Sequence, residues 1–410
     1  MQVVKSEVTR KPYLDGLRGV AAVMVFFAHL TIALMPAFVT FSPGETHSTL
    51  DVAIGLSPLA LVWAGNFAVC IFFVLSGFVL ADFCSLSKIS FPAKMVRRYF
   101  RLALPMLITS AFAWLIMVLG LYKNFDAAVE VTRSGWLSMW YRAFEPNLLG
   151  MAKEALYGAF VDGRANYNSN LWTMQIELIG STYVFLLHTL FRNKALRIIA
   201  ALVFYWLNHK NYYSLFAIGA VLFDLDGLLS HLTATVLPTA RLRECVMVFL
   251  FALGAFCGAF PYVQPGMTAV WHAWLWKSTD ANVWHMIGAQ ILIFALLRST
   301  LMQRVMGGST ARYLGRLSFV LYLIHIPIIC SLAAWLAYGL HDLPYVIVVV
   351  VTAATTMVAV FGASTALYLY VDVYTTAFSR YAGKMIDSWF SVPAPSALPL
   401  GRVGLAPPSR

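Results

Sequence analysis

The feature that most constrains the fold of this chain is a succession of long apolar segments. Of its 410 residues, 60% are hydrophobic and 11% are charged, whereas soluble domains are about 25% charged. A helix needs about 17–25 apolar residues to cross a bilayer. Segments that approach or reach this length lie at about 17–38, 59–82, 102–121, 171–191, 195–208, 212–230, 244–261, 283–299, 313–337 and 343–370. The sequence therefore predicts an all-α, polytopic membrane helix bundle with about ten transmembrane helices.

The charges between these segments predict how the bundle is oriented. Alternate loops are rich in Lys and Arg, and the loops between them are mixed or acidic, as the positive-inside rule requires. The net charge of +11 has its explanation in these basic loops, so no nucleic-acid partner is expected. With this orientation both termini are expected in the cytosol. The protein is expected to be an integral multi-pass protein of the plasma membrane or the endoplasmic reticulum.

The chain is expected to divide into three parts. Residues 1–13 form a polar cytosolic head, and 14–375 form the transmembrane domain. Residues 376–410 form a cytosolic tail that is expected to be partly disordered, since it becomes rich in Pro, Ala and Gly from about residue 391. No cleavage site follows the first apolar run, so that run is expected to remain as an anchor.

Two of the outer loops are longer than a connection requires. In residues 122–170, three aromatic residues stand at helical spacing, which predicts an amphipathic helix at the membrane interface: Trp136, Trp140 and Tyr141. In residues 262–282, three tryptophans predict anchoring at the interface: Trp271, Trp274 and Trp276.

The stretch from Asp15 to Leu30 reads DGLRGVAAVMVFFAHL and holds two ionisable groups in an apolar helix. Arg18 and His29 are eleven residues apart, so they leave the same helix face roughly 16 Å apart along the axis. Arg18 is expected near a membrane boundary and His29 near mid-membrane. An ionisable group there is costly and should face a cavity or a partner. A packed, hydrogen-bonded histidine is an equally good interpretation from geometry alone.

Arg98 and Arg101 stand in a basic run, RRYFRLALP, which begins at Arg97. They lie one helical turn apart on one face. Guanidinium groups bind phosphates through paired hydrogen bonds, so the pair is a candidate clamp for a phosphorylated donor. Ordinary positive-inside charge is the alternative interpretation.

Glu177 stands in the segment NLWTMQIEL, which begins at Asn170. It is expected one to two turns in from the outer boundary, where a carboxylate is neutral, paired with a cation or exposed to a water-filled cavity. Trp172 is expected to line the same outer-side cavity. A structural hydrogen bond or salt bridge is the alternative role for Glu177.

The segment GRLSFVLYLIHIP, from Gly315 to Pro327, places Ser318, Tyr322 and His325 on one stripe of a helix that Pro327 kinks. A structural network is favoured here over catalysis. An earlier segment, IFFVLSGF at 71–78, contains a Ser-Gly pair that allows close approach of another backbone.

Taken in order, these motifs resemble the signatures of the acyltransferase-3 family of integral membrane O-acyltransferases, over about residues 13–375. The resemblance implies acyl transfer from cytosolic acyl-CoA to a hydroxyl of a saccharide or a small metabolite. It implies that His29 is the catalytic histidine, and that Arg18, Arg98 and Arg101 act with the donor. The run YVDVY at 370–374 departs from the Glu-Lys-Pro-like ending of many bacterial members. The hydrolase-like domain appended in some relatives is absent, so a second transfer step is not expected.

The resulting hypothesis is a membrane-bound O-acyltransferase that moves an acyl group, by default acetyl, from acyl-CoA to a hydroxylated acceptor. His29 acts as a general base or a transient acyl carrier, and Glu177 orients it or binds the acceptor. The expected substrate-binding residues are Arg18, Arg98, Arg101, Trp172, Tyr322 and His325. No metal and no permanently bound cofactor are expected, because acyl-CoA is a co-substrate. The other expected partners are the acceptor and the lipid bilayer.

Two other classes of function remain open at this stage. The first is a proton-coupled transporter or flippase in which His29 and Glu177 relay protons, although no internal repeat supports it. The second is a non-catalytic acyl-CoA-binding protein. The acyl chain and the acceptor are not defined by the sequence. The short head and the missing extra domain lean towards a modifier of small molecules, as in secondary metabolite biosynthesis.

Overall fold

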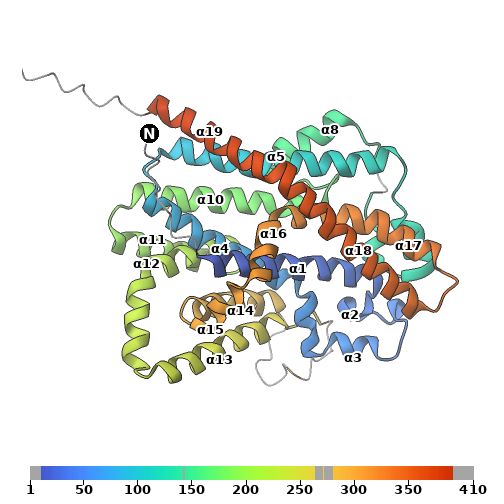
Figure 1. Cartoon of the computed structure of the whole chain (residues 1–410), viewed down its shortest axis with the longest axis horizontal. Helices are drawn as coiled ribbons and strands as arrows, with labels where there is room; N and C mark the ends of the chain where they lie inside the picture. Colours follow the sequence, from blue (N-terminus) through green and yellow to red (C-terminus); the bar gives the residue numbers. More distant parts are fainter. Residues whose placement is uncertain (1–10, 142–143, 264–270, 272–279, 391–410) are drawn as a thin grey trace, which may run out of the picture.

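A computed structural model of the chain describes residues 11–141, 144–263, 271 and 280–390. The described residues form helices and no strand, which confirms the all-α fold class (Figure 1). Trp274, Trp276, the head up to residue 10 and the tail from residue 391 lie outside these ranges. The part of the expected tail before residue 391 is helical.

A helix lies at each of the ten ranges predicted from the sequence. The helices concerned are α1 (Pro12–Leu34), α4 (Gly65–Leu86), α5 (Phe91–Val118), α10 (Trp172–Leu190), α11 (Lys194–Leu207), α12 (Tyr213–Val236), α13 (Ala240–Gly258), α14 (Ala281–Leu296), α16 (Ser309–Ile328) and α18 (Tyr345–Leu367). The C-terminal helix is α19 (Val373–Phe390), and the shorter helices include α2 (Ala37–Thr40), α3 (Asp51–Gly55), α7 (Gly135–Ser138), α8 (Leu148–Lys153), α15 (Thr300–Met306) and α17 (Ala334–Gly339).

The number of membrane crossings is smaller by a strict criterion of length and apolarity. Six helical stretches within the described ranges are long and apolar enough to cross a membrane, and a seventh is added if the bent pair of α14 and α15 is one span. The predicted count of about ten is therefore not confirmed. One reason is length, since α11 has 14 residues.

Helix α1 lies in the middle of the bundle, between α5, α10 and α19 on one side and α13, α14 and α15 on the other (Figure 1). Its main neighbours in space are α16 and α4. Because α1 carries both Arg18 and His29, this central position puts the two predicted groups inside protein, as their cost in lipid requires.

Helix α4 packs backbone to backbone against α12. A Cβ added to Gly77 would lie 2.2 Å from the carbonyl oxygen of Phe216, and one added to Gly219 would lie 2.2 Å from that of Val74. Such contact is possible only where a residue has no side chain. The close approach predicted at Gly77 is thus confirmed, and it fixes α4 beside α12.

The prediction of an amphipathic interfacial helix around Trp136 is wrong. Helix α7 has only four residues, and Tyr141 has a positive φ of 63°, which does not continue a helix. The Ser134 hydroxyl caps α7 and also donates to the carbonyl of Ile32 at 2.6 Å. Since Ile32 belongs to α1, this bond holds the segment against α1, and the Trp136 ring lies 5.3 Å from that of His29.

Candidate active site

Two cavities follow one another along α4, and Val69 and Tyr322 belong to the walls of both. The first, here called the arginine cavity, has a volume of about 140 Å³ and is lined by Arg18, Val69, Phe72, Phe73, Ser76, Arg98, Arg101, Leu102, Thr173, Met174, Glu177, Ser318, Phe319 and Tyr322. The second, here called the histidine cavity, has a volume of about 270 Å³, and His29, Asn66, Trp136, Trp172, Tyr212 and His285 are among its lining residues.

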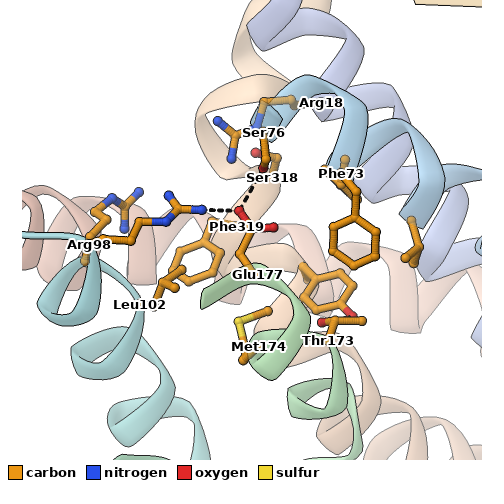
Figure 2. Close-up of a pocket in the computed structure, with 14 residues that line it drawn as sticks. Arg18, Phe73, Ser76, Arg98, Leu102, Thr173, Met174, Glu177, Ser318 and Phe319 are labelled. Atoms are coloured by element: carbon orange, nitrogen blue, oxygen red, sulfur yellow. Dashed lines mark hydrogen bonds and ion pairs between the residues drawn. The ribbon is translucent and has the colours of Figure 1, made fainter. Parts of the chain in front are cut away.

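Glu177 is the centre of the polar contacts in the arginine cavity. It forms an ion pair with Arg98 and accepts a hydrogen bond of 2.7 Å from the Ser76 hydroxyl (Figure 2). The Nε of Arg98 donates to the Ser181 hydroxyl at 2.9 Å. Glu177 is therefore paired with a cation, which was one of the three states expected for it.

Arg101 is held by a carboxylate that the sequence analysis did not select. Its Nη1 and Nη2 donate to the two oxygens of Asp372 at 2.7 and 3.1 Å. Asp372 lies in the segment Tyr368–Asp372 between α18 and α19, within the run that departs from the family ending. A lone carboxylate in an apolar run was the available signal, but the sequence does not say which cation it meets.

Arg18 differs from the other two arginines because it has no ion pair or hydrogen bond among the described residues. In Figure 2 it approaches the arginine cavity from α1, whereas Arg98 approaches from α5. The charges of Arg98 and Arg101 are offset by Glu177 and Asp372. The cavity therefore keeps one uncompensated cation, which is suited to an anionic group.

A third cavity, here called the lysine cavity, adjoins the arginine cavity. It has a volume of about 220 Å³ and shares Arg98 and Arg101 with it. Lys94 and Arg97 also line it, and Lys94 is buried. No carboxylate within the described ranges pairs with either of them. Arg98 and Arg101 are paired with carboxylates, so the unpaired positive charge at this basic edge of the bundle comes from Lys94 and Arg97.

In the histidine cavity, His29 is hydrogen-bonded to a second histidine. The Nδ1 of His29 lies 2.9 Å from the Nε2 of His325 and 3.1 Å from the carbonyl of Val25. The Nδ1 of His325 lies 3.0 Å from the carbonyl of Leu321. A carbonyl only accepts, so Nδ1 of each ring carries the proton, and the Nε2 of His325 accepts from His29. This assignment leaves the Nε2 of His29 unprotonated.

The helix that carries His325 is held by two asparagines that the sequence analysis did not select. Pro327 has no N–H, so it cannot bond the carbonyl of Leu323 four residues earlier. The Asn168 amide donates to that carbonyl at 2.8 Å, and the Asn170 amide donates to the carbonyl of Tyr322 at 2.7 Å. Both asparagines are buried. The kink predicted at Pro327 was the signal that a carbonyl there needs a donor.

The predicted site residues thus fall into two groups that meet at Tyr322. Arg18, Arg98, Arg101 and Glu177 line the arginine cavity, whereas His29 and Trp172 line the histidine cavity, with His325 bonded to His29. The location expected for Glu177 is corrected, because it does not line the cavity that contains His29. The carboxylate instead balances the charge of Arg98, and His325 occupies the position beside His29.

Comparison with known proteins identifies the family. The acyltransferase-3 profile, described as an acyltransferase domain, matches residues 11–365. The chain belongs to the acyltransferase-3 family. It is 24% identical over 388 residues to "Acyltransferase clz18" of Cochliobolus lunatus, covering 78% of this chain and 82% of that protein.

A second relative of the acyltransferase-3 protein is "Acyltransferase R4" of Phoma sp. (strain ATCC 20986 / MF5453). The two are 24% identical over 408 residues, which cover 81% of this chain and 86% of the relative. No solved structure matches the chain significantly. The family match includes both histidines and all four charged residues of the arginine cavity. The protein is therefore an acyltransferase, and its apolar helices identify it as an integral membrane protein.

Proposed function

We propose that this acyltransferase-3 protein transfers an acyl group from acyl-CoA to a hydroxyl of a small-molecule or saccharide acceptor. One observation carries the proposal: a cavity with an unpaired cation and a cavity with an unprotonated imidazole nitrogen share a wall at Tyr322. The donor enters by the arginine cavity and the acceptor by the histidine cavity. Acetyl, the smallest acyl group that acyl-CoA donors commonly carry, is the proposed acyl group.

The unpaired cations are the proposed contacts for the CoA phosphates. Lys94 and Arg97 in the lysine cavity bind the phosphates, and Arg18 lies further along the path of the thioester arm. Arg98 and Arg101 keep N–H groups that their carboxylates do not use, since a guanidinium has five. This arrangement modifies the clamp predicted from the sequence: Glu177 and Asp372 fix the two arginines, and the net positive charge comes from their neighbours.

His29 is the proposed general base. Its Nε2 takes the proton of the acceptor hydroxyl as the oxygen attacks the thioester carbonyl, so a C–O bond forms and the C–S bond breaks. The proton then passes from His29 to the departing thiolate, which leaves as CoA. His325 accepts the hydrogen bond from Nδ1 of His29 throughout, so it stabilises the positive charge that His29 gains. Glu177 has no part in the proton transfer and acts as a positioning residue for Arg98.

The direct test is release of free CoA thiol by the purified full-length protein in vesicles, supplied with acetyl-CoA and alcohols. His29→Gln is expected to abolish release, whereas His209→Gln, an exposed histidine in the loop after α11, is expected to leave it unchanged. Near-normal release by His29→Gln refutes the assignment of the base. Solute flux without any CoA release supports a transporter and refutes the enzyme.

The phosphate contacts have a separate test. Lys94→Ala and Arg97→Ala are expected to raise the KM for acetyl-CoA about tenfold each and to leave the KM for the alcohol unchanged. Arg192→Ala is the matched control, because Arg192 is basic and exposed but lines none of the three cavities. An equal rise in both KM values contradicts a donor-specific role.

A further inference from the structure

The wall of the histidine cavity contains a polar cluster that the proposed chemistry does not use. Asn66 of α4, Tyr212 before α12 and His285 of α14 all line the cavity, and His285 is buried. A Cβ on Gly65 would lie 2.7 Å from that of Ala28. The cluster therefore begins one residue from the point where α4 meets the turn of α1 that carries His29.

Hydrogen-bond accounting shows what this cluster can offer a ligand. The Nε2 of His285 lies 2.8 Å from the carbonyl of Phe260 and must donate to it, so Nδ1 accepts from the Asn66 amide at 2.8 Å. That amide also donates to the side-chain oxygen of Asn282 at 3.2 Å, and the Tyr212 hydroxyl donates to Asn66 Oδ1 at 2.5 Å. The Asn66 N–H groups and the Tyr212 proton are thus in use. What remains are lone pairs on Asn66 Oδ1 and the Tyr212 oxygen, which can only accept.

The rest of the wall that the described residues give the histidine cavity is apolar and uncharged. None of these lining residues is Asp, Glu, Lys or Arg, and their large side chains include Phe38, Trp63, Trp136 and Trp172. A charged ligand there would lose its hydration without gaining a partner. A ligand with a hydroxyl on most of its carbons would bury several polar groups that find no acceptor. Apolar surface on the ligand is favoured instead.

We infer that the acceptor is a neutral, mainly apolar alcohol with a second hydroxyl, and this inference rests on the proposed function. The reacting hydroxyl donates to Nε2 of His29. The second hydroxyl donates its one proton to the Tyr212 oxygen, which Asn66 Oδ1 orients by accepting the Tyr212 proton. These two groups form an acceptor subsite, and the aromatic walls contact the carbon skeleton. Charged and fully hydroxylated acceptors are excluded by the same walls, so the small-molecule branch of the proposed function is favoured over the saccharide branch.

The first test compares matched acceptors with the full-length protein in vesicles and acetyl-CoA as donor. The probes are 1,8-octanediol, 1-octanol, 8-hydroxyoctanoate and methyl β-glucoside, with shorter diols to measure the effect of chain length. The expected kcat/KM is three- to tenfold higher for the diol than for 1-octanol, the gain from about one neutral hydrogen bond. It is expected to rise about three- to fourfold for each added methylene until the cavity is full. Equal use of 8-hydroxyoctanoate or methyl β-glucoside overturns the inference.

The second test removes the subsite. Tyr212→Phe deletes one oxygen and keeps the ring, and Asn66→Leu removes the amide. Either is expected to abolish the preference for the diol, measured as the ratio of its kcat/KM to that of 1-octanol. Tyr205→Phe is the matched control, because its hydroxyl bonds Gln290 and lines neither cavity. Should Asn66→Leu fail to fold, Tyr212→Phe decides alone, and a preserved diol preference in it overturns the inference.

Equilibrium binding of tritiated 1,8-octanediol and 1-octanol to the detergent-solubilised protein separates this inference from the proposed function. If no acyl-CoA yields turnover but the diol binds more tightly and Tyr212→Phe abolishes that difference, the proposed function fails and the acceptor subsite stands. If turnover occurs without any preference for the diol, the subsite fails and the acyltransferase mechanism stands.

Discussion

Replacement of His325 tests whether the second histidine acts through the first. The Nε2 of His325 accepts a hydrogen bond of 2.9 Å from Nδ1 of His29. The Nδ1 of His325 donates a hydrogen bond of 3.0 Å to the carbonyl of Leu321, and this bond sets the tautomer of His325. When His29 takes a proton, that bond becomes charge-assisted, and such bonds contribute about 1.5–3 kcal/mol. At 1.36 kcal/mol per factor of ten, His325→Phe should lower kcat about 10- to 150-fold. The carbonyl of Val25, 3.1 Å from Nδ1 of His29, still holds the ring, which favours the lower end.

The assay is initial-rate CoA release in vesicles, normalised to the amount of folded protein. The KM values for donor and acceptor should change by less than about twofold, because His325 touches neither. His325→Gln keeps an acceptor oxygen, so its kcat should lie between those of His325→Phe and the wild type. A purely structural role for His325 does not predict a higher kcat for His325→Gln than for His325→Phe. His209→Gln is the control. A His325→Phe variant with more than half of the wild-type kcat would refute the reasoning.

Three further predictions concern stability in detergent, measured by thermal unfolding. Gly77→Ala should destabilise the protein by about 1–3 kcal/mol, since the added Cβ would lie 2.2 Å from a backbone oxygen of α12. Gly227→Ala, inside α12 with nothing within 4 Å of the added Cβ, should instead stabilise it by up to about 1 kcal/mol, because Ala is the better helix former. Arg98→Met should cost about 3–5 kcal/mol because it leaves Glu177 buried and unpaired, and replacing both with Met should recover most of this loss; a double variant as unstable as the single one contradicts the pairing. Burial lowers the pKa of His47, which lies between α2 and α3, so the folded state favours the neutral imidazole. The contribution of His47 to the free energy of unfolding is therefore complete above its ordinary pKa and is lost as the pH falls below that value. The melting temperature should therefore drop more between pH 8 and pH 5.5 in wild type than in His47→Asn, and equal drops count against this explanation.

The sequence was sufficient to predict ten of the helices and to select ionisable side chains that the structure places at the two cavities or beside them. Arg18, His29, Glu177 and His325 stand out because ionisable groups are rare in apolar segments, where burying an unpaired charge is costly. The small size of the Ser76-Gly77 pair also predicted correctly that Gly77 permits close packing. These features depend only on residue types and their spacing along the chain, so they can be recognised in a single sequence.

The partners of those side chains depend on which helix faces which, and periodicity within one segment does not contain that information. Glu177 was expected towards the outer side near His29, yet it pairs with Arg98 of α5. Asp372 was noticed only as a departure from a family pattern, although it binds Arg101 through both oxygens.

The spacing of Trp136 and Trp140 suits a helix, but the chain turns at Tyr141 and directs Trp136 towards His29. Asn66 lies in the first turn of α4 and His285 in the second turn of α14. Neither carried a sequence signal that the two share a cavity. The extents of the cytosolic head and tail, the terminal orientation and the identity of the membrane remain predictions.

The glycine contact between α4 and α12 has a consequence for how this scaffold can diversify. Helix α4 contributes Asn66 to one cavity, Phe73 and Ser76 to the other, and Val69 to both. Because the two backbones are in direct contact, α4 cannot slide along α12 or rotate against it. The spacing between the two cavities that α4 lines is therefore fixed. Relatives that keep this glycine contact can therefore admit larger or smaller molecules only by changing the facing surfaces on α1, α16 and the segment around Trp136.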